Sequence, residues 1–231
     1  MFHPHAQLAD VGGDVGMALV ATRPIPAGTV VWALCEFDIV LDSARVPQLP
    51  RPYREILDRY AFVSPTGETI LQWDLARFGN HSCDAICHSV AYDVEIAVRH
   101  IAAGEQITTE YGNLNRNFHF ECACGSPGCR TFVRHDDALR HGQEWDRLIA
   151  DVLPHYARVE QPLAAVVASR PSSLAVLEGR RPPSPSRAGY CPPHRLPDLR
   201  PPPEAESSRA AAAPGRRSRH SVTRPVSADL G

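Results

Sequence analysis

The most constraining feature of this 231-residue chain is a group of three closely spaced cysteines. The segment FECACGSPGCR places Cys122, Cys124 and Cys129 in a C-x-C-x4-C array around a Gly-Ser-Pro-Gly turn. Three thiolates at this spacing can converge on one tetrahedral metal ion, whereas a disulfide between Cys122 and Cys124 would be strained. The array therefore predicts a structural zinc site whose fourth ligand comes from elsewhere in the chain.

Spacing alone leaves the fourth ligand open among Cys83, Cys87, His119 and His135. The chain holds seven cysteines, which are too few and too unevenly placed for a disulfide scaffold and favour metal or thiol chemistry.

Charge is divided unevenly along the chain. Residues 1–169 carry 13 Arg against 21 Asp and Glu, a balance of −8, and residues 170–231 carry 11 Arg against 5 acidic residues, a balance of +6. All basic residues are Arg, and there is no Lys. An acidic body disfavours direct binding of nucleic acid, which needs a basic face, and it suits a basic partner. A zinc-dependent nucleic-acid module is therefore a weak alternative.

The final 62 residues, 170–231, differ in composition from the rest of the chain. They are rich in Pro and Arg and contain few large apolar side chains, so they predict a disordered tail. No apolar run approaches the ~18 residues of a transmembrane helix. The first residues also lack the basic start and apolar core of a secretory signal. We expect no membrane association, and a cytoplasmic protein of a bacterium.

Short runs rich in Val, Ile and aromatic residues recur between turn signals, which predicts a mostly β domain with few helices. Strands are expected at 17–22, 29–34, 36–41, 69–73 and 94–101. One helix is predicted near 52–60. A second is predicted to begin at the Asp136–Asp137 pair, which can cap it, and to end at Pro154. Its expected apolar stripe consists of Leu139, Trp145, Leu148, Ile149 and Val152.

Four motifs occur in a fixed order along the chain: GMALVATRPIPAGTVV (16–31), RFGNHSC (77–83), EIAVRHIAAGEQITTEYG (95–112) and FECACGSPGCR (120–130). Together they resemble the SET-domain protein-lysine methyltransferases with a post-SET zinc module, of the short stand-alone bacterial type. The resemblance implies a β-clip fold of several short sheets, in which the segment RFGNHSC forms a pseudoknot. It also implies a SET domain at 8–117 with an insert region at 43–76, a post-SET segment at 118–133 and a C-terminal helix at 134–160.

The resemblance implies that the chain binds S-adenosyl-L-methionine as methyl donor. The family's G-x-G motif reads Gly16, Met17 and Ala18 here, so alanine replaces the second glycine. Alanine fits that position only with a negative φ. Asn80 would bind the amino-acid end of the cofactor and the main chain of His81 its adenine. Phe132 would pack on the adenine.

The same resemblance assigns Cys83 as the fourth zinc ligand, beside Cys122, Cys124 and Cys129, and leaves Cys87 as a buried thiol. The site would hold the post-SET segment over the active site. The resemblance thus implies a structural zinc, and because four thiolate ligands leave no open coordination position it argues against a zinc hydrolase.

Tyr111 matches the catalytic tyrosine of the family, and Glu110 stands where an aspartate is usual. Thr109 occupies the position of a Phe or Tyr that limits the number of methyl groups added, so we expect no steric restriction to monomethylation. Tyr92 and Phe118 are further candidates for the wall of the lysine channel. The motifs offer no protein base, so water is expected to remove the proton from the amine.

These features predict methyl transfer to the ε-amine of lysine in a basic protein substrate. The alternative is a catalytically silent SET module that binds peptide or cofactor without turnover, which the altered Ala18 and Thr109 keep open. The sequence is compatible with a monomer.

Overall fold

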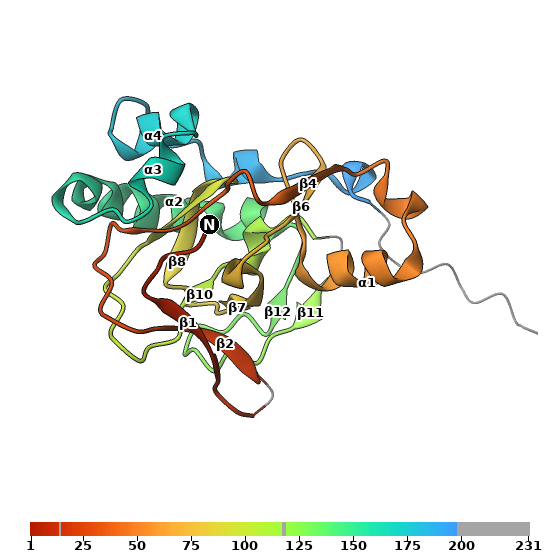
Figure 1. Ribbon diagram of the computed structural model, residues 1–231, viewed down its shortest axis with the longest axis horizontal. Helices are drawn as coiled ribbons and strands as arrows, with labels where there is room; N and C mark the ends of the chain where they lie inside the picture. Colours follow the sequence, from red (N-terminus) through yellow and green to blue (C-terminus); the bar gives the residue numbers. More distant parts are fainter. Residues whose placement is uncertain (14, 117–118, 198–231) are drawn as a thin grey trace, which may run out of the picture. The chain divides into compact units, whose positions relative to one another are not determined.

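Short strands dominate the fold because β-branched and aromatic runs alternate with turns that contain Gly or Pro. The computed structural model describes residues 1–13, 15–116 and 119–197 (Figure 1). Its strands are β1 (Ala6–Asp10), β2 (Met17–Ala21), β3 (Val30–Ala33), β4 (Ile39–Asp42), β5 (Phe62–Val63), β6 (Glu68–Leu71), β7 (Asn80–His81), β8 (Cys87–Ala91), β9 (Val94–Ala97), β10 (Thr108–Thr109), β11 (Phe120–Glu121) and β12 (Phe132–Val133). The prediction of a mostly β fold of several short sheets is confirmed.

Helices are fewer and mostly short. The α-helices are α1 (Arg51–Tyr60), α2 (Asp137–Val152), α3 (Ala164–Val167) and α4 (Pro171–Leu177). The 3-10 helices are η1 (Val46–Gln48), η2 (Leu75–Phe78), η3 (Tyr111–Asn113), η4 (Leu153–Arg158), η5 (Ser186–Gly189) and η6 (Pro193–Arg195). Among the described residues, no helix has the length and apolar character needed to span a bilayer.

The strands form four small sheets. A five-stranded sheet has the order β3-β9-β8-β10-β7, and a three-stranded sheet has the order β4-β6-β5. β1 pairs with β2, and β11 pairs with β12, as two separate two-stranded antiparallel sheets. The edge strand β7 runs parallel to β10, with Asn80 opposite Thr108 and His81 opposite Thr109. This parallel pairing brings two motifs together that lie about thirty residues apart in sequence.

The largest apolar core lies between the five-stranded sheet and helices α2, α3 and α4, which gather beside β8 (Figure 1). Val94 and Ile96 of β9 face this core, together with Ile149 and Val152 of α2. Because side chains alternate along a strand, Glu95 between them points to the opposite face of the sheet. Helix α1 lies away from this core and contacts β6.

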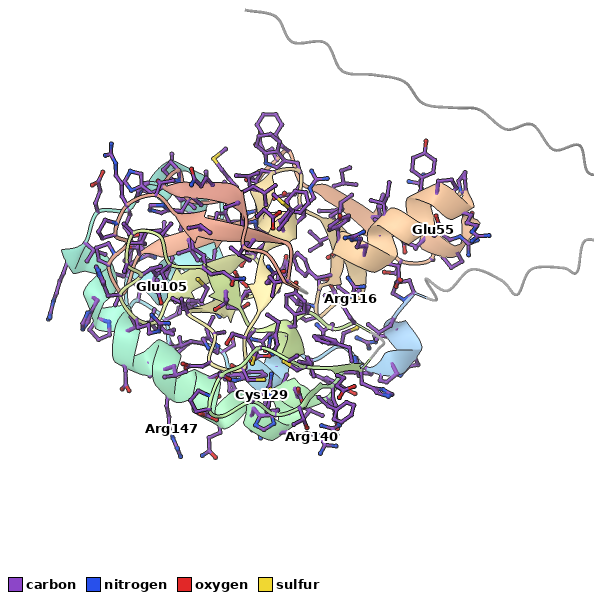
Figure 2. All side chains as sticks on the ribbon, turned by 90° about the horizontal axis from the view of Figure 1, so that it is seen from below. Glu55, Glu105, Arg116, Cys129, Arg140 and Arg147 are labelled. Atoms are coloured by element: carbon purple, nitrogen blue, oxygen red, sulfur yellow. The ribbon has the colours of Figure 1, made fainter. Side chains whose placement is uncertain are left out.

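Helix α2 differs from its sequence prediction in two details. The side chain of Asp136 does not cap the helix but pairs with Arg140, one turn on. Of the expected apolar stripe, Trp145, Ile149 and Val152 are buried, whereas Leu139 and Leu148 are exposed. The stripe is narrower because Asp137, Ala138 and Gly142 occupy the remaining buried positions, and Gly142 lets Ser186 of η5 approach closely. Arg140 and Arg147 project outward from the helix (Figure 2).

Part of the predicted disordered tail is folded. Helix α4 buries Val176 and Leu177 in the main core, and Ser173 donates a hydrogen bond to Asp93 at 2.7 Å. Downstream, Cys191 donates its backbone N–H to Asn115 at 2.8 Å. The disorder prediction therefore fails for residues 170–197, because a short apolar run within a polar, Pro-rich segment docks on the sheet. The remainder of that tail lies outside the described residues.

Candidate functional site

The four cysteines singled out as zinc ligands come together. The sulfur atoms of Cys83, Cys122, Cys124 and Cys129 all lie within 4.8 Å of one another. A tetrahedral zinc ion with Zn–S bonds of about 2.3 Å holds its sulfurs about 3.8 Å apart. The Cys83 and Cys122 sulfurs are 3.8 Å apart, so the cluster could hold one such ion with little rearrangement. Cys87 is buried in the neighbouring apolar core and takes no part in the cluster.

Backbone N–H groups point at these sulfurs and favour their thiolate forms. The Cys83 N–H donates to the Cys124 sulfur at 3.4 Å, and the Arg130 N–H donates to the Cys83 sulfur at 3.4 Å. Burial alone would raise the pKa of the Cys124 thiol. Hydrogen bonds from the Ser126 hydroxyl and the Cys83 N–H outweigh burial and lower that pKa to about 6. A site with this donor chemistry fits a structural metal ion.

The loop that carries three of the cysteines is held by unusual backbone conformations. Gly125 adopts a φ of +73°, and Thr131 adopts a φ of +63°. A β-branched residue in this left-handed region is strained. The strain accompanies two hydrogen bonds, since the Thr131 N–H donates to the Cys129 sulfur and its carbonyl accepts from the Cys122 N–H.

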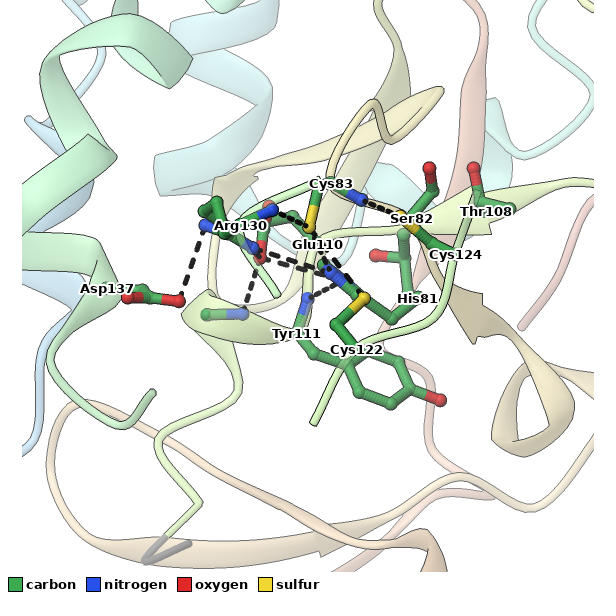
Figure 3. Close-up of polar contacts among 12 residues, drawn as sticks. His81, Ser82, Cys83, Thr108, Glu110, Tyr111, Cys122, Cys124, Arg130 and Asp137 are labelled. Atoms are coloured by element: carbon green, nitrogen blue, oxygen red, sulfur yellow. Dashed lines mark hydrogen bonds and ion pairs between the residues drawn. The ribbon is translucent and has the colours of Figure 1, made fainter. Parts of the chain in front are cut away.

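His81 lies between the cysteine cluster and Tyr111 (Figure 3). Its Nδ1 accepts the backbone N–H of Tyr111 at 3.2 Å, and its Nε2 lies 3.3 Å from the Cys83 sulfur. Burial, aided by the charge of Arg130, lowers the pKa of His81 to about 4, so the ring is neutral. An imidazole whose Nδ1 accepts must carry its proton on Nε2, where it can donate to the thiolate.

Tyr111 directs its ring away from the cysteines (Figure 3). Its hydroxyl donates to the Gly79 carbonyl at 2.6 Å, and burial raises the pKa of the phenol. The neutral hydroxyl is thus fixed to the backbone of Gly79, within the RFGNHSC segment. Thr109, two residues before Tyr111, lines the same cavity.

Sequence reasoning missed Arg130, which ties the cysteine loop to the rest of the site. Its guanidinium lies 2.7 Å from Glu110 and 3.4 Å from Asp137, both buried, and over the ring of Trp145. Glu110 also accepts the Gly112 N–H at the start of η3. The longer glutamate in place of aspartate therefore reaches Arg130 while capping the turn that carries Tyr111. The sequence signal that could have identified Arg130 is its position directly after the candidate ligand Cys129.

The segments expected to bind the cofactor meet in space. Gly16 has a φ of +64°, with no atom within 4 Å of where a Cβ would be. Asn80 donates its amide to the Met17 carbonyl at 3.0 Å. Ala18 is fully buried opposite Ala9, and it is absent from the positive-φ residues among the described chain. Ala18 therefore meets the requirement for a negative φ that applies when alanine replaces the second glycine of the motif.

Other candidates lie apart from this centre. Phe132 on β12 is 37% exposed, with the Arg134 guanidinium over its ring. Tyr92 is 41% exposed and lines a different cavity from Thr109. Phe118 lies outside the described residues.

Two cavities adjoin at the open face of the sheet. A smaller one of about 60 Å³ is lined by Tyr111, Thr109 and Gly79, among others. A larger one of about 210 Å³ is lined by Tyr92 and by residues 184–186, 188 and 189 of the C-terminal segment. They share one titratable side chain, Glu95, which sequence reasoning also missed. A single charged residue in an otherwise apolar strand gives no signal of this position.

Comparisons with known proteins match part of the chain. Residues 16–112 match the model of the SET domain family. A 73-residue stretch is 32% identical to the histone-lysine N-methyltransferase trithorax of Drosophila virilis and 30% identical to that of Drosophila melanogaster. Each stretch covers 29% of this chain and only 2% of the relative's length.

Solved structures also match. The methyltransferase domain of human histone-lysine N-methyltransferase SETMAR aligns with a TM-score of 0.43 and 21% identity over 58% of each chain. KRYPTONITE, solved in complex with mCHG DNA and SAH, aligns with a TM-score of 0.38 and 22% identity, over 53% of this chain and 28% of that one. The family match and the motif geometry above agree that residues 16–112, less than half of the chain, are similar to a SET domain.

Proposed function

We propose that this protein transfers a methyl group from S-adenosyl-L-methionine to the ε-amine of lysine in a basic protein. The observation that carries the proposal is the position of the Tyr111 hydroxyl. It donates to the Gly79 carbonyl at 2.6 Å and borders a narrow cavity with Thr109. A phenol fixed in this way can orient an amine that enters the cavity.

Alignment and exclusion of water are the main tasks in such a reaction. Methyl transfer needs the amine nitrogen, the methyl carbon and the leaving sulfur in one line. The bound cofactor would supply the electrophilic methyl group. The backbone at Gly16 and Met17 and the side chain of Asn80 would hold it, and Tyr111 would orient the incoming nitrogen.

The amine must be neutral before it can react. A free lysine has a pKa of about 10.4, so deprotonation at pH 7 costs roughly 4.6 kcal/mol. Loss of water in the narrow cavity and the positive charges of Arg59, Arg77 and Arg116 in its wall disfavour the ammonium form and supply part of that energy. The negative balance of residues 1–169 would steer a basic substrate toward the protein, with a dependence on ionic strength.

Zinc bound by the four cysteines would have a structural role. The ligands come from Cys83 on one side and the 122–129 loop on the other, so the ion would fasten this loop to the Asn80–His81 strand. Metal binding energy then becomes folding energy for this part of the protein.

The test uses the full chain loaded with zinc, isotopically labelled S-adenosyl-L-methionine and a pool of basic proteins, with lysine products identified by mass spectrometry. We expect label on lysine from the unaltered protein and at least a ~100-fold lower rate from Tyr111→Phe. Tyr53→Phe, at an exposed tyrosine of α1, is the matched control and should keep full activity. A folded, zinc-loaded protein that binds the cofactor but labels no lysine would favour the silent module.

A further inference from the structure

Glu95 is a carboxylate on the cavity side of the five-stranded sheet. It lies on β9 between Val94 and Ile96, whose side chains fill the main core on the other face. Its cross-strand partners are Trp32 on β3 and Ser89 on β8. Because opposite residues in a ladder share a face, these three side chains line the same surface.

The carboxylate of Glu95 lies next to the residues proposed to act on the amine. The Thr109 hydroxyl donates to its Oε1 at 2.6 Å. Glu95 and Tyr111 line the smaller cavity together, and Glu95 also lines the larger one. It therefore stands where the two cavities meet. Within residues 1–13, 15–116 and 119–197 it forms no ion pair at 4 Å or less.

The cationic groups of the smaller cavity are engaged elsewhere. Arg116 donates to the Ala61 carbonyl at 2.8 Å, Arg77 donates to the Asp74 carbonyl at 3.1 Å, and the Arg59 guanidinium lies over the Tyr60 ring.

The other titratable groups facing the two cavities are three phenols and a thiol. They are Tyr60, Tyr92, Tyr111 and Cys87. Burial raises the pKa values of Cys87, Tyr92 and Tyr111. Glu95 is therefore the one carboxylate among the described lining residues of either cavity.

Glu95 is half-buried, and a carboxylate partly withdrawn from water without a cationic partner has a raised affinity for a proton. Burial raises the pKa of Glu95, and hydrogen bonds from the Thr109 and Ser89 hydroxyls oppose that shift. A raised pKa brings a carboxylate closer to the range in which general bases act at neutral pH. An entering lysine ammonium would be the missing cationic partner.

We propose that Glu95 is the proton acceptor for the substrate lysine, an inference that rests on the proposed function. One N–H bond of the ammonium breaks and an O–H bond forms on the Glu95 carboxylate, which leaves the nitrogen lone pair free for the methyl group. The proton then passes from Glu95 to water in the larger cavity, so each methyl transfer releases one proton. Thr109 fixes the carboxylate, and Tyr111 orients the amine.

The test compares Glu95→Gln with the unaltered protein across pH 7 to 10, with a lysine peptide that the unaltered protein methylates. Glutamine keeps the size of the side chain and an acceptor for the Thr109 hydroxyl but cannot take the proton. At pH 7 we expect kcat to fall about 100-fold, with KM changed far less. The variant's rate should then rise about tenfold per pH unit as lysine loses its proton in solution, whereas the unaltered protein should depend less on pH.

Two further variants and two binding measurements complete the test. Glu95→Asp should keep more activity than Glu95→Gln because it retains a carboxylate, and Glu144→Gln, at an exposed site on α2, should match the unaltered protein. Cofactor affinity and zinc content should be unchanged in all variants. Label on lysine from Glu95→Gln at an unaltered rate and with an unaltered pH profile overturns this inference alone. No label from the unaltered protein and any substrate overturns the proposed function and this inference with it.

Discussion

The imidazole of His81 accepts the backbone N–H of Tyr111 through Nδ1, at 3.2 Å. Its other nitrogen lies 3.3 Å from the sulfur of Cys83. One buried ring therefore connects the cysteine cluster with the residue proposed to orient the amine. A change at the cluster reaches Tyr111 through two contacts, without passing through solvent.

His81→Phe should weaken both ends of this connection. The variant leaves the buried Tyr111 N–H without an acceptor, which costs about 1–3 kcal/mol in the free energy of unfolding. It also removes the donor to Cys83, and loss of such a partner typically lowers metal affinity about 10–100-fold. Denaturant unfolding and competition with a zinc chelator measure the two effects. His100→Asn, at an exposed turn, is the control, and equal zinc affinity in both variants would contradict this role of His81.

Removal of zinc should destabilise the loop that carries the cysteines. Cys83→Ser should lose the ion, because one of four converging sulfurs is gone. Cys87→Ala should keep one zinc per chain, since this buried thiol lies outside the cluster. Metal analysis of the purified variants checks both statements. Chelation should lower the Tm of the unaltered protein and of Cys87→Ala but leave that of Cys83→Ser unchanged.

The sequence predicted β2, β3, β4, β6, β9, α1, α2 and the cysteine cluster for physical reasons, and it missed the shorter strands, β1, β8, α3 and α4. Strands at 17–22, 94–101 and elsewhere are marked by β-branched runs, and the tight C-x-C-x4-C spacing restricts Cys122, Cys124 and Cys129 to one loop. The choice of Cys83 as the fourth ligand came from the order of the motifs. In the structure, Cys83 follows β7 by two residues, and the parallel pairing of β7 with β10 fixes the position of that strand.

The sequence could not predict two features that depend on distant contacts. Glu95 is one charge in an apolar strand, and such a residue usually faces solvent. Its face of the sheet borders a cavity because β8 places Ser89 opposite Glu95 and because Thr109 lies within hydrogen-bond distance of it. Residues 170–197 have the composition of a disordered segment, and their order depends on a few apolar side chains docking on a sheet far away in sequence.

The folded part of the C-terminal segment leads to a truncation prediction. A chain that ends at residue 169 loses α4, and burial of Val176 and Leu177 is worth about 1.5–3 kcal/mol each. It also leaves Asp93 without its bond from Ser173. We therefore expect a free energy of unfolding several kcal/mol lower than that of a chain ending at residue 197. Denaturant unfolding of the two truncated chains measures the difference, and equal midpoints would show that α4 adds no stability.

Thr109 is expected to permit more than one methylation. Its small side chain borders the cavity with Tyr111 and uses its hydroxyl to bind Glu95. We expect the unaltered protein to form dimethyl- or trimethyllysine. Thr109→Tyr should shift the product toward monomethyllysine because the larger ring fills the cavity. Mass spectrometry of a methylated peptide reads the product directly, and Thr109→Ser, which keeps the hydroxyl, should retain the higher states. Monomethyllysine alone from the unaltered protein and every variant would refute the steric argument.

The burial of His88 leads us to expect a lower free energy of unfolding in mild acid. It is 2% exposed beside the ring of Trp145. Burial, aided by the charge of Arg130, lowers its pKa from 6.5 to about 4, although a hydrogen bond with the Ala85 backbone opposes the shift. The unfolded chain therefore binds a proton at a pH where the folded chain does not. The resulting stability is fully present above about pH 6.5 and is lost as the pH falls toward about 4.

His88→Phe removes this titration while keeping an aromatic ring against Trp145. Between about pH 6.5 and 4.5, the free energy of unfolding of the unaltered protein should fall by up to about 1.4 kcal/mol more per pH unit than that of the variant. The variant keeps some acid sensitivity, because burial also lowers the pKa of His3 to about 4. Urea unfolding with excess zinc at several pH values gives both slopes. Parallel slopes would mean that His88 is protonated in the folded protein, and the ring would then need an acidic partner in place of its apolar surroundings.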